Sequence, residues 1–381
     1  MKYVLPLTID FKKSHGSYLV DKNTNDEYLD FFNMYSSLPL GYNHKIFDKS
    51  FKEKINEISY IKMANNVCKS EELMEFIELF KGYTFSDNFH FTSTGALAVE
   101  SALKTAMHYK KVKEPMVISV KNSFHGVNSW GFTTSRVGVT AKRMEYFPKN
   151  SWLDLELDEI IEYLNTKDLQ NLTAVIIEPI QATNGDIYLD KDKLKVIRKL
   201  CLDNDICFIL DEVQTGFGTS GKMWYYEHLD IIPDILVFGK KAQVSGIVVS
   251  DKYKEILENP YQKLDVTFDG ELIDIVRATY ILKAFKKYDI LENVNKFSKI
   301  IKNELKDKVL NYRSVGALIA FDFEIQKQRD AFVKKCFDNK LLINKAGEKT
   351  VRLRPNLATD DKDIYNFLNL ITYNLSNIFR G

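Results

Sequence analysis

The sequence predicts an α/β protein built on a mainly parallel sheet with helices on both faces, together with a smaller α+β domain. From about residue 70 to residue 250, short apolar runs alternate with stretches that have the length and periodicity of helices. The apolar runs are almost continuous, as is typical of parallel strands buried on both faces. At the two ends of the chain, short strand-like runs are mixed with helices and turns, which indicates a smaller unit built from both termini.

The expected elements follow one another along the chain. Residues 16–32 (GSYLVDKNTNDEYLDFF) hold two short strand-like runs around an Asn/Asp turn. Strands are then expected at PMVISV (115–120), LTAVII (172–177), ICFIL (206–210) and DILVF (234–238), and helices at ALAVESALKTAMHYKK (96–111) and LDKDKLKVIRKLCLDN (189–204). Phe/Tyr-rich helices around residues 270–306 would connect the two units, and SVGALIAFDFE (314–324) and TVRLRP (350–355) are strand-like.

These elements predict the domain organisation. We expect residues 1–50 to be an N-terminal segment that joins the small domain, residues 51–290 to form the large domain, and residues 291–381 to form the C-terminal small domain. No linker of low complexity and no internal repeat separates them. The domains should therefore be joined by structured segments.

Composition narrows the class of partner. The chain has 381 residues, of which 45% are hydrophobic and 28% charged, and 53 Lys and Arg against 52 Asp and Glu give a net charge of +1. No overall field would draw it to nucleic acid or to an anionic membrane, so small molecules are the expected partners. The four cysteines form no CxxC and have no histidine at ligand spacing, so no metal site and no disulfide framework are expected. Without a signal-peptide pattern or a membrane-length apolar run, we expect a cytoplasmic protein.

Polar side chains follow the four expected strands. In open parallel sheets, ligands bind beyond the carboxyl ends of the strands. Those positions hold Phe124-His125-Gly126, Glu178, Asp211 and Lys240. Upstream, in FTSTGALAVESALK, Ser93, Thr94 and Gly95 precede a strong helix former. The free N–H groups of Gly95 and Ala96 would then form an anion site at the N-terminus of a helix.

Together these groups fit pyridoxal phosphate (PLP). This cofactor needs an amine that forms an imine, an anion site for its phosphate, a carboxylate that keeps the pyridine nitrogen protonated, and an aromatic face against its ring. The chain supplies one of each, in Lys240, the turn from Ser93 to Ala96, Asp211 and Phe124.

Taken alone, each group has a commoner use. Ser-Thr-Gly before a helix is usually a plain N-cap, Phe124 would usually be core, and Asp211 could be a loop acid beside a solvated Glu212. In the doublet Lys240-Lys241, Lys240 ends the DILVF strand and should face the site, whereas Lys241 should be a solvated surface charge.

Two other classes of protein remain open from the residues. GFGTSGK (216–222) satisfies G-x-G-x-x-G and almost satisfies the Walker pattern, which favours a nucleotide-binding enzyme. Against it, Met223 stands where a magnesium-binding hydroxyl is needed, and residues 211–215 separate the apolar run from the first glycine. A protein with the PLP fold but no activity is the other alternative, because fold does not guarantee activity.

The stretch ILDEVQTGFGTSGKMWYYEHLDIIPDILVFGKKAQVSG closely resembles the signature of class III aminotransferases, which are PLP enzymes of fold type I. GALAVESALK, SFHG, EPIQ and VRLRP occur in the order found in that family, and the resemblance runs nearly from end to end. The segments FGKKAQVSG and GALAVE are most similar in sequence to the L-lysine 6-aminotransferase branch.

The resemblance implies a role for each matching position. Lys240 would be the Schiff-base lysine and Asp211 would pair with the pyridinium nitrogen. Gln214 would lie near the ring hydroxyl, Phe124 would stack on the ring, and Val213 would cover its other face. The phosphate would be held by three residues of one subunit and one of its partner: Thr94, Gly95 and Ala96, with Thr267 from the partner.

The resemblance also implies a homodimer with shared active sites. For three further positions it leaves two roles open. Arg352 would bind a substrate carboxylate, and because it alternates with Arg354 on a strand, one of the two could form only an ion pair. His125 is either a cofactor contact or a hydrogen-bonded scaffold residue, and Glu178 either touches substrate or holds a neighbouring loop.

The implied reaction moves a terminal amino group, as in lysine 6-aminotransferase, to 2-oxoglutarate and gives an aldehyde and glutamate. Two departures leave the amine open. Thr183 stands where family members that handle terminal amines usually have a glutamate that pairs with the arginine at position 352, and Val127 stands where the lysine branch tends to have an arginine. Ornithine, 4-aminobutyrate, a diamine or an amino sugar are the alternative donors.

Overall fold

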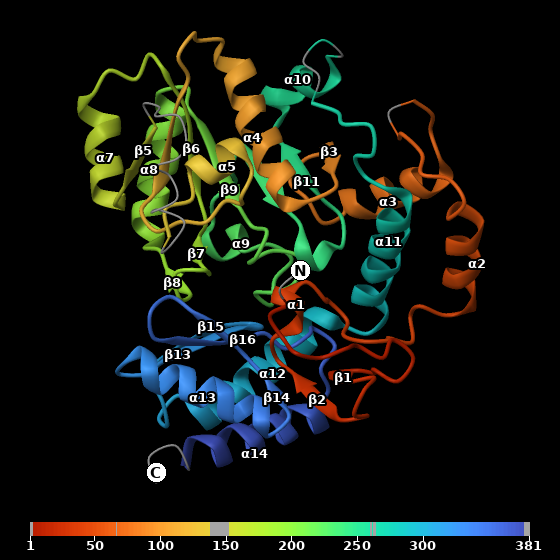
Figure 1. The fold of residues 1–381 in the computed structure, drawn as a ribbon. Helices are drawn as coiled ribbons and strands as arrows, with labels where there is room; N and C mark the ends of the chain where they lie inside the picture. The colour runs from red at the N-terminus through yellow and green to blue at the C-terminus, as the bar shows by residue number, and fades with distance from the viewer. Residues whose placement is uncertain (1–2, 66, 138–151, 260, 262–263, 377–381) are drawn as a thin grey trace.

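The computed structural model describes residues 3–65, 67–137, 152–259, 261 and 264–376. Helices and strands alternate along most of the chain (Figure 1). In order, they are β1 (Tyr18–Val20), β2 (Glu27–Asp30), α1 (Asn33–Ser36), α2 (Lys49–Ile58), α3 (Glu71–Lys81), β3 (Asn88–Thr92), α4 (Gly95–Lys110), β4 (Met116–Val120), α5 (Ser129–Thr133), β5 (Leu153–Leu155), α7 (Leu157–Thr166), β6 (Leu172–Ile177), β7 (Ile180–Gln181), β8 (Ile187–Tyr188), α8 (Lys191–Asp203), β9 (Cys207–Asp211), α9 (Tyr226–Leu229), β10 (Ile235–Phe238), the single turn η2 (Lys240–Ala242), β11 (Ser245–Val249), the single turn η3 (Asp251–Tyr253), α10 (Lys254–Glu258), α11 (Leu272–Lys287), α12 (Ile290–Leu305), β12 (Leu310–Val315), β13 (Leu318–Asp322), α13 (Gln326–Asp338), β14 (Leu341–Leu342), β15 (Asn344–Ala346), β16 (Thr350–Leu353) and α14 (Asp361–Ser376).

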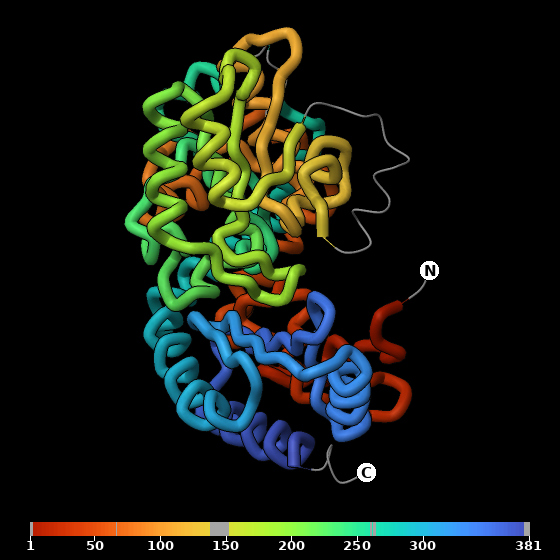
Figure 2. Tube along the Cα trace, turned by 90° about the vertical axis from the view of Figure 1, so that its left-hand side faces the viewer, coloured from red at the N-terminus to blue at the C-terminus, as the bar shows by residue number. Residues whose placement is uncertain are grey.

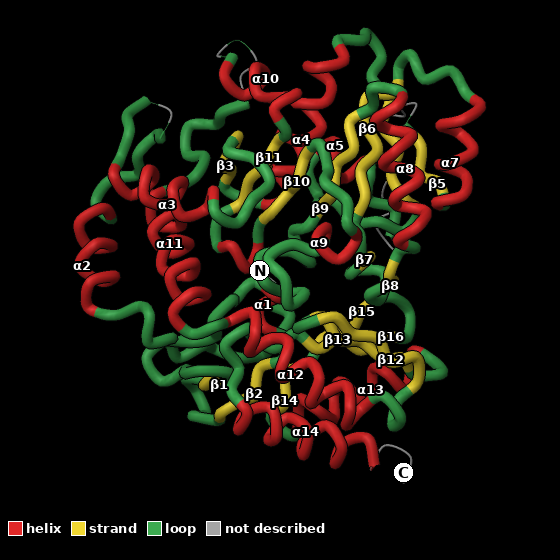
Figure 3. The backbone as a smooth tube through the Cα atoms, turned by 180° about the vertical axis from the view of Figure 1, so that it is seen from behind, coloured by secondary structure: helices red, strands yellow, loops and turns green. Residues whose placement is uncertain are grey.

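The main sheet has seven strands in the order β3-β11-β10-β9-β6-β4-β5. The neighbours from β10 to β5 run parallel, and β11 runs antiparallel to both β10 and β3. Every residue of β4, β6, β9 and β10 is buried, because helices cover both faces (Figure 3). α4 packs across β6, β9, β10 and β11, and α8 packs against β9. The predicted mainly parallel sheet is confirmed, with one antiparallel strand that the apolar pattern did not reveal.

The smaller part of the molecule contains two sheets that combine both ends of the chain. β2 pairs antiparallel with β1 and parallel with β14, so N-terminal and C-terminal strands share one sheet. β12, β13, β16 and β15 form a four-stranded antiparallel sheet. Figure 2 shows the first and last segments, red and blue, side by side below the large sheet. The predicted smaller α+β part is confirmed, while the boundaries at residues 50 and 290 stay predictions.

Two long helices connect the parts. α11 packs against α2 and α3 beside the large sheet, and α12, which packs against α11, also contacts β12 and α14 in the smaller part. Within the described ranges, no helix has the length and the apolar character that crossing a membrane requires.

An aromatic cluster holds α3 against the end of β10. The ring of Phe80, which is 0% exposed, lies 5.2 Å from that of Phe76 and 5.2 Å from that of Phe238. Phe238 is the last residue of β10, two positions before Lys240. Rings at this separation contribute packing energy beyond their buried area, so the cluster fixes the strand end from which the site begins.

Replacing Phe80 by Ala should therefore destabilise the protein by about 3–5 kcal/mol, because the change leaves a cavity among the surrounding rings. Chemical denaturation followed by circular dichroism measures this loss. Tyr365→Ala, at a position that is 56% exposed on α14, is the control and should change the free energy of unfolding by less than about 0.5 kcal/mol. Equal effects of the two substitutions would contradict the assignment of Phe80 to the core.

Candidate active site

A cavity of about 240 Å³ lies at the carboxyl ends of β4, β6, β9 and β10. It is lined by Gly95, Ala96, Val99, Phe124, His125, Gly126, Val127, Glu178, Thr183, Asp211, Val213, Gln214 and Lys240. Of the predicted cofactor residues, only Thr94 and Thr267 are missing from this lining. The parallel pairing of Val237 with Asp211 and of Ile177 with Leu210 brings the strand ends to one edge of the sheet.

Lys240 follows β10 after Gly239 and begins the single turn η2, with a left-handed backbone (φ 47°). Its side chain is half-buried and reaches the cavity. Burial lowers the pKa of Lys240 to about 8, and the nearby Asp211 carboxylate partly offsets this shift. A buried ammonium is disfavoured because it loses its hydration. Lys240 therefore offers a neutral amine closer to physiological pH than an ordinary lysine does.

Asp211 and His125 form a buried pair. His125 Nδ1 lies 2.8 Å from Asp211 Oδ2, and the backbone N–H of Val213 donates to Asp211 Oδ1 at 3.1 Å. His125 itself is held because its backbone N–H donates to Ser135 Oγ at 2.7 Å. The histidine thus has the position of a scaffold residue that orients the carboxylate at the cavity.

The N-terminus of α4 forms the opposite wall. Thr94 is its N-cap, and the Thr94 hydroxyl accepts a hydrogen bond from the N–H of Leu97 at 3.3 Å. The first N–H groups of a helix have no partner inside the helix and attract anions. Gly95 packs so tightly that an added Cβ would lie 3.1 Å from Val213 Cγ1. At Gly126, where φ is +107°, an added Cβ would lie 3.0 Å from Ala96 Cβ. Gly95 and Ala96, whose N–H groups begin the helix, both border the cavity.

Glu178 holds the loop that carries Phe124. Its Oε1 accepts a hydrogen bond from the backbone N–H of Phe124 at 2.7 Å. Glu178 is 5% exposed, and burial raises its pKa to about 7. Of the two predicted uses of Glu178, the loop contact is the one that the geometry displays, while the carboxyl also borders the cavity.

Arg352 and Arg354 leave β16 toward the same side, but they have different partners. Arg354 Nη2 forms an ion pair with Asp186 Oδ1 at 2.5 Å. Arg352 Nη1 donates to the carbonyl oxygen of Ala182 at 2.8 Å, its Nε has no hydrogen-bond partner, and no carboxylate among the described residues forms an ion pair with it. Burial, followed by repulsion from Arg354, lowers the pKa of Arg352 to about 10. Arg352 is therefore a buried cation that forms no ion pair within the described part of the chain, although the carboxylates of Asp186 and Glu178 act to raise its pKa.

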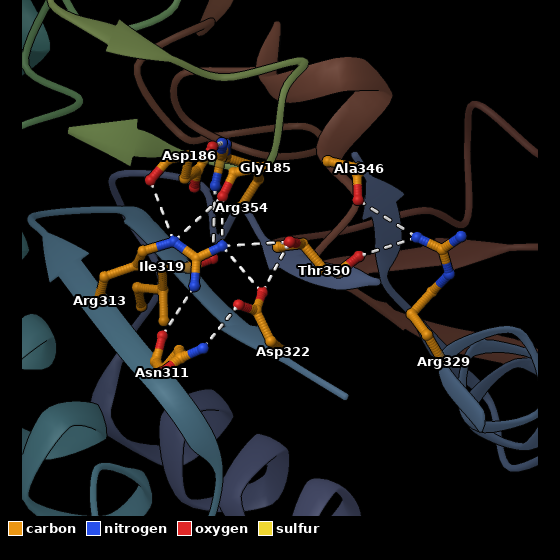
Figure 4. A network of polar contacts seen from close by, with 10 residues as sticks. All are labelled: Gly185, Asp186, Asn311, Arg313, Ile319, Asp322, Arg329, Ala346, Thr350 and Arg354. Atoms are coloured by element: carbon orange, nitrogen blue, oxygen red, sulfur yellow. Dashed lines mark hydrogen bonds and ion pairs between the residues drawn. The ribbon is translucent and has the colours of Figure 1, made fainter. Parts of the chain in front are cut away.

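The loop that carries Thr183 is fixed from below by a polar network (Figure 4). Arg313 Nε donates to the carbonyl oxygens of Gly185 and Asp186, each at 3.0 Å, and Arg313 Nη2 lies 2.9 Å from Asp322 Oδ1. With the ion pair between Arg354 and Asp186, these contacts hold the loop against β13 and β16. Thr183, which replaces an expected glutamate, therefore occupies a defined place in the cavity wall.

The prediction for Lys241 is wrong. Its side chain is 2% exposed, and its Nζ donates to the carbonyl oxygen and the hydroxyl of Ser36, at 3.2 and 2.9 Å. The pattern could not reveal this because the covering residue is more than 200 positions away. Glu212 is likewise not solvated: at 1% exposure, it accepts backbone N–H groups from Tyr225 and Tyr226 at 2.5 and 2.8 Å, and burial raises its pKa to about 8.

The glycines of GFGTSGK pack against side chains. An added Cβ on Gly216 would lie 2.5 Å from the ring of Trp224, and one on Gly218 would lie 2.6 Å from Phe285. The N–H of Gly218 already donates to the carbonyl oxygen of Met223 at 3.0 Å. This buried loop leaves no space for a nucleotide phosphate, so the structure contradicts the nucleotide-binding alternative.

Two further positions lie at the margin of the site. Thr267 belongs to an exposed turn beside α4, where Ser93 Oγ donates to the carbonyl oxygen of Phe268 at 3.1 Å. Val127 borders the cavity with a side chain that is 68% exposed. No charge from either position enters the cavity.

The residues present fit PLP. The cavity combines a lysine amine of lowered pKa, an anchored carboxylate, the open N-terminus of α4, and the face of Phe124. Gln214 adds a buried side-chain oxygen without a hydrogen-bond partner, as expected of a group that meets a polar atom of a ligand. These are the groups that the cofactor requires.

Comparison with known families agrees with this geometry. The family model described as aminotransferase class-III matches residues 2–375. The chain belongs to the class III aminotransferase family. It is accordingly a PLP-dependent transaminase of fold type I, and the predicted family, fold and cofactor are confirmed.

Two named aminotransferases are similar to this chain over most of their length. The chain is 30% identical over 406 residues to the L-lysine-epsilon aminotransferase of Mycobacterium tuberculosis, covering 94% of this chain and 90% of that protein. It is 29% identical over 376 residues to the acetylornithine aminotransferase of Clostridium acetobutylicum, covering 93% of each.

Among solved structures, the lysine aminotransferase from M. tuberculosis in the internal aldimine form superposes with a TM-score of 0.92 at 27% identity, covering 99% of this chain and 97% of that one. A transaminase from the marine bacterium Virgibacillus, at 20% identity and a TM-score of 0.87, shares the fold.

The lowered pKa of Lys240 has a measurable consequence. Only the neutral amine is nucleophilic, so the rate at which cofactor-free protein takes up PLP should rise with pH and level off above about 8, the pKa to which burial lowers this lysine. Stopped-flow absorbance across a pH series measures this profile, with Lys240→Ala as the control that shows no uptake phase. A rate that keeps rising toward the ordinary lysine value of 10.5 would contradict the effect of burial.

Proposed function

We propose that this class III aminotransferase transfers the terminal amino group of an amine, with L-lysine as the leading candidate, to 2-oxoglutarate, giving an aldehyde and glutamate. The observation that supports the acceptor is the position of Arg352. This buried guanidinium forms no ion pair among the described residues, and it is bonded to the carbonyl oxygen of Ala182, next to Thr183 in the wall of the cavity that holds the Lys240 amine. A buried unpaired charge is costly, and a substrate carboxylate would satisfy it.

The residues would divide the work as follows. PLP, when bound, supplies the electron sink for the bond that breaks next to the substrate nitrogen. Lys240 Nζ would hold the cofactor between turnovers and move the proton at the substrate carbon during them. Asp211, oriented by His125 and the N–H of Val213, would keep the charge on the pyridine nitrogen.

Binding would use the two ends of the cavity. The N–H groups at the start of α4 would hold the phosphate, Phe124 and Val213 would enclose the ring, and Gln214 would meet its hydroxyl. Arg352 would hold the carboxylate of the 2-oxo acid. Because Thr183 offers no negative charge, Arg352 would be available in both half-reactions.

Two observations bear on the amine donor, and they support different candidates. The lysine donor is supported by the relatives named L-lysine-epsilon aminotransferase. Val127, a neutral and exposed side chain, gives no partner for a second substrate carboxylate. An amine without an α-amino-acid end, such as a diamine or an amino sugar, is the second candidate, and this neutral wall favours it.

We further propose a cytoplasmic homodimer whose sites are completed across the interface. Support comes from exposed large apolar side chains on segments 60–67 and 261–268, near the turn of Thr267: Tyr60, Ile61, Val67, Tyr261, Val266 and Phe268. Such clusters on a globular protein mark an interaction surface. In the dimer, Thr267 of one subunit would reach the phosphate held by the other.

A panel of amines tests the proposed donor. L-Lysine, L-ornithine, 4-aminobutyrate, a diamine and an amino sugar are each mixed with the PLP-loaded protein in the absence of a 2-oxo acid, and the visible absorbance of the lysine-bound cofactor is followed. We expect lysine to bleach this absorbance fastest and 2-oxoglutarate to restore it. If only the amino sugar or the diamine bleached the absorbance, that amine would replace lysine as the donor. Recovery of the absorbance without any 2-oxo acid would contradict transamination.

A further inference from the structure

The turn α1 (Asn33–Ser36) has a left-handed backbone. Its four residues have φ values of 56°, 46°, 59° and 69°, and none is glycine. Side chains disfavour this conformation because Cβ approaches the following carbonyl oxygen, and consecutive left-handed residues are rare. Such a segment persists only where its surroundings hold it, and strain of this kind concentrates at functional sites.

Two side chains from the Lys240 loop hold this turn. Lys241 Nζ donates to the carbonyl oxygen and the hydroxyl of Ser36, and Gln243 Nε2 donates to the carbonyl oxygen of Ser37 at 2.6 Å. Both donors lie within three residues of Lys240, while the acceptors belong to the N-terminal segment (Figure 1). The reactive loop and the turn are therefore joined directly.

Burial disfavours the charged form of Lys241, which is held by hydrogen bonds. Burial lowers its pKa well below the usual range, with further lowering by Arg354 and Lys240, and Asp30 counteracts this only in part. Asp30 is occupied by the other end of the turn, since its Oδ1 accepts the N–H groups of Phe32 and Asn33 at 2.9 and 2.7 Å. The turn is thus held at its start by Asp30 and at its end by Lys241.

The middle of the turn faces outward. Asn33 and Ser36 are each 1% exposed, whereas Tyr35 is 48% exposed. The segment also lies beside the strand end that carries Arg352, because the N–H of Arg354 donates to the carbonyl oxygen of Phe31 at 2.7 Å. The Tyr35 phenol is one of the groups that raise the pKa of Arg352. Fixing the two ends of the turn fixes the direction in which Tyr35 projects.

We propose that Lys241 is a positioning residue, which ties the Asn33–Ser36 turn to the Lys240 loop and thereby fixes this turn, with Tyr35, next to the strand end that carries the carboxylate-binding Arg352. The inference rests on the proposed function for the role of Arg352. It gives the second lysine of the doublet a role separate from that of Lys240, in substrate affinity and not in holding the cofactor.

The test uses Lys241→Met, which keeps length and burial but removes both hydrogen bonds. The PLP-loaded variant should retain its visible absorbance, since Lys240 is unchanged. It should bind glutarate, a non-reactive dicarboxylate, about tenfold more weakly by calorimetry, because the two Ser36 acceptors lose their donor. Hydrogen exchange should be faster at residues 33–38.

Three further variants separate the possible outcomes. Ser36→Ala removes one acceptor and should weaken glutarate binding in the same direction, to a smaller extent, even if Lys241→Met does not fold. Lys191→Met removes a lysine that donates to the carbonyl oxygen of His228 at 2.7 Å and does not line the cavity, and should change neither readout. Tyr35→Phe combined with Lys241→Met should weaken binding by less than the product of the single effects, because both substitutions alter the same turn.

The results decide the proposal in two steps. Unchanged exchange at residues 33–38 in both Lys241→Met and Ser36→Ala would overturn the tether. Faster exchange with unchanged glutarate affinity would overturn the positioning role. Arg352→Ala identifies the failure of the proposed function: if it leaves glutarate affinity unchanged, the carboxylate site itself is wrong and the role of Lys241 in affinity fails with it.

Discussion

The parallel register of β6, β9 and β10 is the constraint on which the site depends. Because Ile177 pairs with Leu210 and Val237 with Asp211, these strands end at one edge of the sheet. Each has a polar residue at its end or within two positions of it: Glu178, Asp211 and Lys240. The edge is closed by the N-terminus of α4, which packs across the same strands. An amine, a carboxylate and an anion site that are distant in sequence thereby line one cavity.

Burial gives these groups their chemistry. Desolvation is the largest influence on the pKa of Lys240, Glu178 and Arg352, and in each case it disfavours the charged form. Arg354 forms an ion pair with Asp186, whereas Arg352 forms no ion pair among the described residues. The two neighbouring arginines therefore differ: Arg354 is paired inside the protein, whereas Arg352 donates only to the carbonyl oxygen of Ala182 among the described residues.

The sequence pattern predicted those features of the fold and the site that depend only on residues close together along the chain. The strands, the helix at Gly95 and the polar residues after each strand are local, because apolar runs and caps are set within about ten residues. The environment of Lys241 is not local, since its acceptor Ser36 comes from a separate part of the fold. The same reason explains Glu212 and the glycines of GFGTSGK, which resemble a solvated acid and a phosphate loop until the packing of Tyr225 and Trp224 is known. The strand β11 was not among the predicted strands, and its antiparallel direction follows from its pairing with β10 and β3.

The account distinguishes two adjacent lysines that share a loop and a buried setting. Lys240 faces the cavity, and Lys241 is turned toward Ser36. Borohydride reduction of the PLP-loaded protein fixes the cofactor to the amine that carries it, and peptide mass mapping then locates the modified residue. The account predicts the modification on Lys240 alone, and a modification on Lys241 would contradict it.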